Sequence, residues 1–269
     1  MQRYTDIIEP LSLDEAYLDV TDATHFNGSA TRIAEAIKQA VNKELSIHVS
    51  AGVAPNKFLA KIASDWEKPD GLFVITPPQV EAFVLKLAVN KINGVGKVTT
   101  KKLNALDVHT CGDLQTLGIH TLSEKFGKYG ARLHELSHGI DHRPVQTSRI
   151  RKSLSVEHTF SKDLYTSHDI EEELPKLYQE LCERVKKLEP DAKINKRLVK
   201  VKFNDFTQTT LEESFNMATD SWEKPKEYTR MLLQAWRRSE KPVRLLGIGI
   251  RLLTPSHSNN LMQMDLFNT

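Results

Sequence analysis

Two adjacent acids interrupt an apolar stretch near the start of the chain, in Ser12-Leu13-Asp14-Glu15-Ala16-Tyr17-Leu18-Asp19. Successive strand residues point to opposite faces, so Asp14 and Glu15 can share one site only where the backbone turns. The pattern predicts a tight hairpin, residues 7–13 and 16–20, with both carboxylates at its tip. Exposed carboxylates there can hold a hard cation such as Mg²⁺. An ordinary acidic β-turn is the alternative, because Asp is a common turn residue.

The length of 269 residues exceeds what one hydrophobic core usually serves, so we expect two or three domains. Hydrophobic residues at 39% and charged residues at 27% are typical of a soluble globular protein. We find no membrane-spanning run and no signal peptide, so no membrane partner is expected. Cys111 and Cys182 form no metal-binding pattern and suit a reducing cytoplasm, which predicts a cytoplasmic protein.

Charge is unevenly distributed along the chain. Residues 1–75 carry 7 basic and 11 acidic side chains, residues 76–148 carry 9 and 6, and residues 149–253 carry 21 and 17. An acidic first segment followed by two basic ones suits a metal-dependent centre with attached nucleic-acid-binding parts.

The first segment, residues 1–76, alternates strand and helix patterns and predicts an α+β sheet domain. After the hairpin we expect a helix capped by residues 28–31, a strand at 47–53, a helix after Asn56 and a strand at 72–75.

Charged residues share one face of the helix after Asn56. Lys57, Lys61 and Asp65 recur at four-residue spacing, and Lys68 follows the helix. A solvated charged face is the ordinary interpretation. The functional interpretation is that one or two of these lysines reach the phosphates of a substrate near the acidic hairpin.

A mostly helical unit follows, from residue 77 to residue 141. Its strongest signal is Lys91-Ile92-Asn93-Gly94-Val95-Gly96-Lys97, leading into a short helix. Glycines let the backbone approach a ligand, and N–H groups opening a helix can face a phosphate. The pattern resembles the helix-hairpin-helix module, which holds DNA through its backbone; an ordinary turn between helices is the alternative. The expected DNA contacts are Gly94, Gly96, Lys97 and Lys101, with Lys128 at a second glycine-bounded helix start.

Residues 142–152 contain four basic residues and no acids, which predicts a basic linker. Residues 153–253 follow a β-α-β-β-α-β order, in which helices cover one face of the sheet. Apolar residues alternate with Lys200 and Lys202, so the open face would carry lysines. Arg151, Arg244 and Arg251 could join these lysines on DNA, although a merely solvated outer face is the alternative.

The last residues, 254–269, are polar and then end in an apolar group. An apolar pair beyond a flexible stretch has no nearby core to join, which predicts a docking peptide. A strand or short helix that packs back on the protein is the alternative. The residues of the expected peptide are Gln263, Met264, Asp265, Leu266 and Phe267.

Together these motifs resemble the bacterial Y-family translesion DNA polymerases, through Ser12–Asp19, Ser50–Ala54, Lys57–Asp65 and Lys91–Lys97. The resemblance covers essentially the whole chain and implies an α+β multidomain fold. It implies that residues 1–76 are the later part of the palm, 77–141 the thumb, 142–152 a linker, 153–253 the little finger domain and 254–269 a tail that binds the sliding clamp.

The resemblance also implies a reaction. A primer 3′-hydroxyl attacks the α-phosphate of a deoxynucleoside triphosphate on primer-template DNA, with two Mg²⁺ ions as cofactors. Asp14 would bridge both ions and Glu15 would hold the ion that activates the hydroxyl. Lys68, with Lys61 as a helper, would neutralise triphosphate charge.

One departure from the family pattern bears on activity. The family's palm begins with a strand that carries another metal-binding Asp, followed by the fingers, and neither has a counterpart here. We therefore expect a polymerase that lacks this N-terminal part and is catalytically impaired alone. The alternatives are a non-catalytic, clamp-tethered DNA-binding fragment and a helix-hairpin-helix repair nuclease. Nothing in the sequence demands more than a monomer.

Overall fold

The computed structural model describes residues 1–190, 192–216 and 220–253. The chain forms two compact units that divide between Arg149 and Ile150. Each unit has its own cluster of buried hydrophobic residues. The finer division at residues 76 and 141 stays a prediction.

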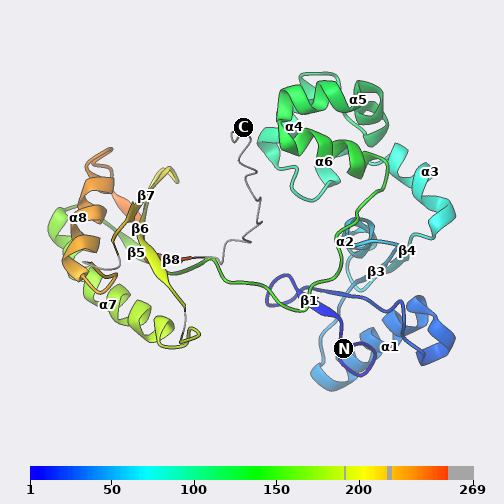
Figure 1. Ribbon diagram of the computed structural model, residues 1–269, viewed down its shortest axis with the longest axis horizontal. Coiled ribbons are helices and arrows are strands. Elements are labelled where there is room, and N and C mark those ends of the chain that lie inside the picture. The colour runs from blue at the N-terminus through cyan, green and yellow to red at the C-terminus, as the bar shows by residue number, and fades with distance from the viewer. Residues whose placement is uncertain (191, 217–219, 254–269) are drawn as a thin grey trace, which may run out of the picture. The chain divides into compact units, whose positions relative to one another are not determined.

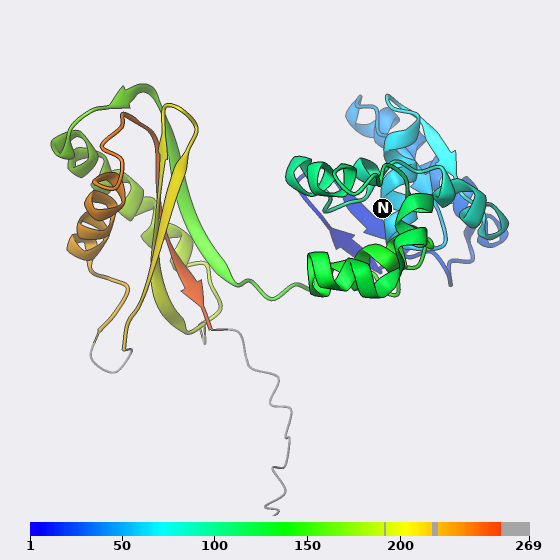
Figure 2. The same ribbon diagram turned by 90° about the horizontal axis from the view of Figure 1, so that it is seen from above.

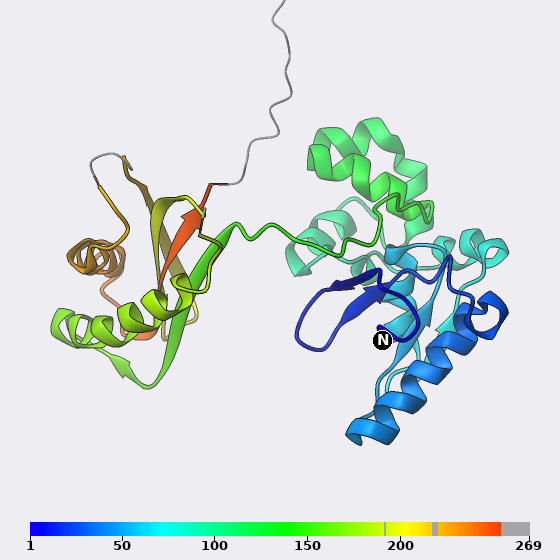
Figure 3. The same cartoon turned by 60° about the horizontal axis from the view of Figure 1, so that its bottom comes forward.

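The first unit begins with the predicted β-hairpin (Figure 3). Strand β1 (Ile8–Pro10) pairs antiparallel with β2 (Ala16–Leu18), and Glu9 lies opposite Tyr17. Asp14 and Glu15 lie in the connecting turn. The ladder is shorter than predicted because the amides of residues 11 and 12 already donate to the Glu15 carbonyl within the turn.

Two helices follow the hairpin, and each begins at a capping side chain. Ser29 accepts a hydrogen bond from the backbone at the start of α1 (Ala30–Leu45), and Asn56 does the same for α2 (Lys57–Trp66). Such caps satisfy backbone N–H groups that have no partner within a helix. Both predicted helices are confirmed.

Strands β3 (Ala51–Val53) and β4 (Leu72–Val74) pair in parallel, and α2 connects them. A Cβ on Gly52 would lie 2.3 Å from backbone atoms of α2, so only glycine lets β3 lie this close to the helix. The strand predicted at 47–53 is confirmed only at its end, and β1–β2 and β3–β4 are separate two-stranded sheets.

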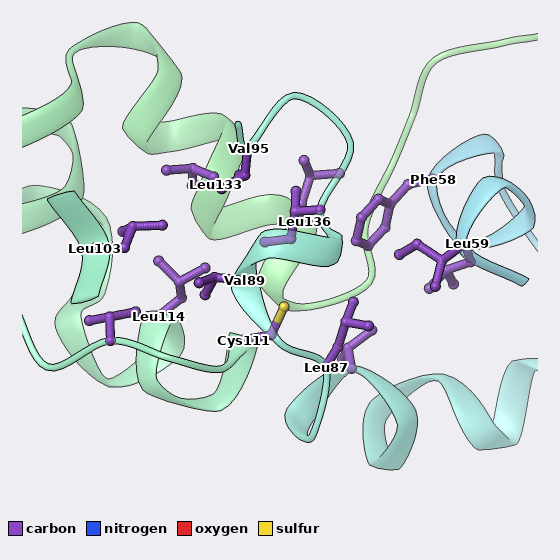
Figure 4. Packing of buried hydrophobic residues seen from close by; sticks show 14 of the residues in the cluster. Phe58, Leu59, Leu87, Val89, Val95, Leu103, Cys111, Leu114, Leu133 and Leu136 are labelled. Atoms are coloured by element: carbon purple, nitrogen blue, oxygen red, sulfur yellow. The ribbon is translucent and has the colours of Figure 1, made fainter. Parts of the chain in front are cut away.

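Helices make up the remainder of the first unit (Figure 1). They are α3 (Val80–Leu85), α4 (Lys97–Asn104), α5 (Cys111–Phe126) and α6 (Lys128–Ser137), with short 3-10 turns at Pro77–Gln79 and Val89–Lys91. A further 3-10 turn, His25–Gly28, precedes α1. Phe58 and Leu59 of α2 belong to the same buried cluster as Leu133 and Leu136 of α6 (Figure 4). A continuous core therefore joins α2 to the helical part.

The second unit has the predicted β-α-β-β-α-β order: β5 (Ser153–Leu164), α7 (Ser167–Val185), β6 (Ile194–Phe203), β7 (Gln208–Ser214), α8 (Pro225–Trp236) and β8 (Val243–Leu252). Its sheet has the strand order β5-β8-β6-β7, and all neighbours are antiparallel. Helices α7 and α8 cover one face (Figure 2). Val199, Val201 and Phe203 are buried beneath them, which leaves the alternate residues of β6 on the open face.

The structure confirms the expected α+β fold class. Among the described residues, no helix combines the length and the apolar character that a membrane crossing requires.

Candidate active site and nucleic-acid interface

The tip of the β1–β2 hairpin carries the two predicted acids. Asp14 is exposed and Glu15 is partly buried. The Ser12 hydroxyl donates to Asp14 Oδ1, and this hydrogen bond, aided by the charges of Lys68 and Lys61, lowers the pKa of the Asp14 carboxyl below its ordinary value. Asp14 is therefore ionised at neutral pH, as a cation ligand must be.

Two lysines meet the hairpin tip from α2 and the residues after it. Lys61 Nζ lies 2.7 Å from Glu15 Oε1 and 3.4 Å from Asp65 Oδ2, and Lys68 Nζ lies 2.5 Å from Asp65 Oδ1. Desolvation alone would lower the pKa of the Lys61 ammonium, but the hydrogen bond to Glu15 and the charge of Asp65 raise it. The structure thus brings Asp14, Glu15, Lys61 and Lys68 into one cluster of alternating charge.

The two carboxylates of this cluster can bind a divalent cation only if other groups supply the remaining ligands. Asp14 and Glu15 offer the oxygens that hard cations prefer, and one oxygen of Glu15 already contacts Lys61. Across the residues that the structure describes, no three His, Cys, Asp or Glu side chains are grouped so that they could hold a metal ion. Two protein ligands are the number with which Mg²⁺ commonly binds when substrate phosphates and water supply the remainder.

Lys57 does not join this cluster. Its side chain is 9% exposed, forms an ion pair with Glu9 of β1, and donates to the carbonyl of Pro144 at 3.0 Å. Lys57 is therefore not part of a solvated face, whereas the prediction that one or two of these lysines reach substrate phosphates stays a prediction. The sequence carries no signal for the pair, since its members lie 48 residues apart.

The predicted helix-hairpin-helix turn lies between the 3-10 turn at 89–91 and α4. Gly94 has φ of +97°, which glycine adopts without strain. Gly96 precedes α4, and no heavy atom lies within 4 Å of the position that a Cβ would take there. An open hollow of about 540 Å³ lies beside it, lined by Lys97 and Lys101 among others. The turn therefore exposes backbone and two cations to the same space.

The second glycine-bounded helix start lies next to the first. Tyr129 Oη lies 3.1 Å from the position that a Cβ on Gly94 would occupy. Packing requires glycine at position 130, because a Cβ there would lie 2.0 Å from the Leu122 carbonyl oxygen of α5. Lys128 is exposed at this helix start.

On the open face of the second sheet, the predicted cations divide into two groups. Lys200 Nζ lies 2.9 Å from Glu157 Oε2, so its charge is already paired, and Arg251 is likewise paired with Glu212. The charged ends of Lys202 and Arg244 instead lie 4.9 Å and 5.4 Å from the centroid of the Phe206 ring. Phe206 is 63% exposed and was missed from the sequence, where its only signal is an aromatic residue in a polar turn.

Comparison with known proteins decides the family. The chain is 53% identical to a DNA polymerase IV of Pseudomonas syringae pv. tomato over 268 residues, which is 99% of this chain and 73% of that protein. A DNA polymerase IV of Pseudomonas aeruginosa is 54% identical over 250 residues, 93% of this chain and 70% of that protein. The chain belongs to the Y-family DNA polymerases.

Family matches cover both units of this Y-family chain. Residues 1–65 match the impB/mucB/samB family, residues 151–266 match the C-terminal domain of that family, and residues 90–141 match the thumb domain of DNA polymerase iota. The last match includes the helix-hairpin-helix turn, which supports the thumb assignment.

Solved Y-family structures share the fold. A chimera named Dbh-Dpo4(243-245)-Dbh matches with a TM-score of 0.78 and 29% identity, covering 93% of this chain and 72% of that one. An insertion ternary complex of Dbh DNA polymerase matches with a TM-score of 0.57 and 28% identity, covering 94% and 72%.

Two predicted sites of this Y-family chain remain, the DNA contact Arg151 and the clamp-binding peptide. Arg151 is exposed in the segment before β5. The expected clamp-binding peptide, residues 263–267, lies outside the described residues.

Proposed function

We propose that the chain performs template-directed DNA synthesis past damaged template bases, adding deoxynucleotides to a primer 3′ end. The observation that carries this proposal is the pair of hairpin-tip carboxylates beside two lysines in a chain of the Y family. The relatives named DNA polymerase IV support the reaction class. Error-prone copying follows from the family resemblance alone.

The hairpin tip suits two-metal phosphoryl transfer. Asp14 and Glu15 would hold Mg²⁺, which when bound stabilises the charge on attacking and leaving oxygens. Lys61 and Lys68 would neutralise triphosphate charge, and a nucleotide could draw them away from Glu15 and Asp65. No side chain needs to act as a covalent nucleophile.

Primer-template DNA would lie against two surfaces. Gly94, Gly96, Lys97 and Lys101 of the helix-hairpin-helix turn would hold phosphates, with Lys128 beside them. Lys202 and Arg244, with the exposed Arg151, would contact the backbone from the second unit, whereas Lys200 is neutralised by Glu157. We propose residues 263–267 as the peptide for the sliding clamp, and cytoplasm as the location.

A second candidate is a non-catalytic, clamp-tethered DNA-binding protein. The observation that favours it is that two carboxylates at the hairpin tip would have to serve two metal ions, since the described residues group no third acid with them. We accordingly expect the chain alone to extend primers weakly.

Primer extension with Mg²⁺ and deoxynucleotides separates the two candidates. The chain is compared with D14N/E15Q and with E171Q/E172Q, a matched control in which two adjacent exposed acids of α7 are changed. Extension that is lost only in D14N/E15Q supports the polymerase. Equal extension by all three would overturn the assignment of Asp14 and Glu15. No extension with salt-sensitive DNA binding retained supports the second candidate, and strand cutting with Mg²⁺ would indicate a nuclease instead.

A further inference from the structure

A lysine of α2 contacts three separate parts of the first unit. Lys57, whose side chain is 9% exposed, forms an ion pair with Glu9 of β1 and lies 5.1 Å from the ring centroid of Tyr17 on β2. It also donates to the carbonyl of Pro144 at 3.0 Å. One ammonium group therefore touches both strands of the acidic hairpin and the segment that leads to the second unit.

Glu9 makes a second contact with that segment. Its Oε2 accepts a hydrogen bond of 2.8 Å from the amide of Gln146, and its side chain is 21% exposed. Burial would raise the pKa of the Glu9 carboxyl, but the bonds with Lys57 and Gln146 lower it. Glu9 is therefore a charged, largely buried group that both neighbours stabilise.

Asp141 fastens the same segment to the first turn of α2. Its carboxylate is fully buried, accepts from the amide of Phe58 at 3.1 Å, and is paired with Arg132 at 2.6 Å and Arg143 at 2.8 Å. Residues 141–146 are thus bonded to α2 and to β1 by three acceptors: Asp141, Glu9 and the Pro144 carbonyl.

These contacts matter because the hairpin has little stability of its own. Its strands are three residues each, and isolated two-stranded hairpins are marginal in water. Removing one partner of a buried ion pair strongly destabilises the folded protein, because the other charge stays buried without compensation. A second pair, Lys61–Glu15, joins α2 to the hairpin tip but is more exposed, so the Lys57–Glu9 pair is the buried ionic contact that orients the hairpin on α2.

We propose that Lys57 and Glu9 are positioning residues: their ion pair locks the hairpin that carries Asp14 and Glu15 onto α2 and fastens residues 141–146 at the same point. The stretch expected to be a linker, 142–152, is then held as far as Gln146. Residues 147–151 then connect this point to the second unit, where the Lys152 carbonyl accepts a hydrogen bond from the amide of Leu252. The consequence for metal binding rests on the proposed function, whereas the locking itself does not.

Amide hydrogen exchange of the free chain tests the locking directly. In K57M and in E9Q, we expect about tenfold or faster exchange at Leu11 and Asp19, whose amides donate within and beside the hairpin, and at Gln146. Exchange in α1 and in the second unit should be unchanged, which shows that each variant is folded. Unchanged exchange at Leu11, Asp19 and Gln146 in a folded K57M protein would overturn the proposal.

A charge swap and a matched lysine provide the controls. The double variant K57E/E9K restores an ion pair, so exchange at Leu11 and Asp19 should return toward that of the unmodified chain. Continued fast exchange at both amides would count against the pair as the lock. Lys38 is 14% exposed and pairs with Asp70 at 2.8 Å. K38M should therefore affect residues 70–71 and leave the hairpin protected, whereas loss of hairpin protection in K38M contradicts a specific role for Lys57.

Mn²⁺ affinity distinguishes a change in the position of the hairpin acids from the mere loss of the Lys57 charge. Removing a nearby positive charge would by itself strengthen cation binding at Asp14 and Glu15, whereas loss of positioning weakens it. We expect weaker Mn²⁺ binding in K57M and recovery in K57E/E9K, with D14N/E15Q as the reference for no site. Stronger binding in K57M would overturn the positioning role. If the unmodified chain binds no Mn²⁺, the proposed metal function fails, and hydrogen exchange still decides the locking.

Discussion

Lys61 Nζ lies 2.7 Å from Glu15 Oε1, so one of the two hairpin-tip carboxylates already has a cation beside it. Lys61 comes from α2 and Glu15 from the hairpin turn, 46 residues apart in sequence. A divalent cation on Glu15 and the phosphates of a nucleotide would compete for the two members of this pair. We therefore expect the Lys61–Glu15 ion pair to open when the cation and the nucleotide bind.

Replacing Lys61 tests whether this lysine binds the nucleotide phosphates. We expect K61Q to weaken deoxynucleotide binding about tenfold, the size of one charged hydrogen bond, and to leave DNA affinity unchanged. The raised pKa of Lys61 keeps it protonated, so its contribution should persist through the alkaline range and fall only as pH rises through that pKa. Titration with labelled nucleotide measures the effect, and K43Q, at an exposed lysine of α1, is the control. Equal nucleotide affinity in K61Q and K43Q contradicts the assignment.

Gly96 allows a test of backbone contact with DNA that does not disturb the fold. A Cβ at this position meets no heavy atom within 4 Å, so G96A should stay folded, with a small loss of stability because alanine is a poorer N-cap than glycine at the start of α4. If a phosphate approaches this backbone, the added methyl group should lower DNA affinity about tenfold. Fluorescence anisotropy with primer-template DNA measures it. Unchanged affinity in G96A would remove this turn from the interface.

Lys202 and Lys200 differ by their partners, although they are neighbours on one strand face. Lys200 is paired with Glu157, whereas Lys202 lies over the Phe206 ring. K202A should weaken DNA binding and reduce the slope of log affinity against log salt by about one. K200A, the matched control, should have a smaller effect because its charge is already neutralised. Equal losses in the two variants refute the distinction.

Cys111 should resist modification in the folded protein. It is fully buried, and desolvation raises the pKa of its thiol to about 12. Because the folded value lies above the unfolded one, the associated stability is complete below about pH 9 and is lost as pH rises from there toward 12, by about 1.4 kcal/mol per pH unit. Iodoacetamide labelling with peptide mapping, with and without denaturant, measures the reactivity. Rapid labelling of Cys111 in the native chain contradicts its burial.

Removal of residues 263–269 tests the proposed clamp peptide. We expect at least about tenfold weaker binding to a sliding clamp and unchanged affinity for DNA, because the tail acts by raising the local concentration of the polymerase. Surface plasmon resonance on immobilised clamp measures the first, and anisotropy the second. Removal of residues 254–258 alone is the control for length. Undiminished clamp binding without residues 263–269 would disprove the peptide's role.

Local patterns were enough to predict most of the elements. The acids at 14 and 15 predict a turn because alternate strand residues face opposite ways, and Asn56 predicts the start of α2 because it caps free N–H groups. The order of elements in the second unit follows from similar periodicities. The strand at 47–53 was predicted too long, since its length depends on how far β4 extends beside it.

The sequence by itself determined the helices, the hairpin with its two acids, the glycine turn before α4 and the β-α-β-β-α-β unit, because each depends on residues that are near neighbours in the chain. Only the tertiary structure decided which cations are free. Lys57 is buried against Glu9, Lys200 is neutralised by Glu157, and Lys61 is held at Glu15. These partners lie more than 40 residues apart. Their distances, and so their electrostatic energies, exist only once the strands and helices have packed.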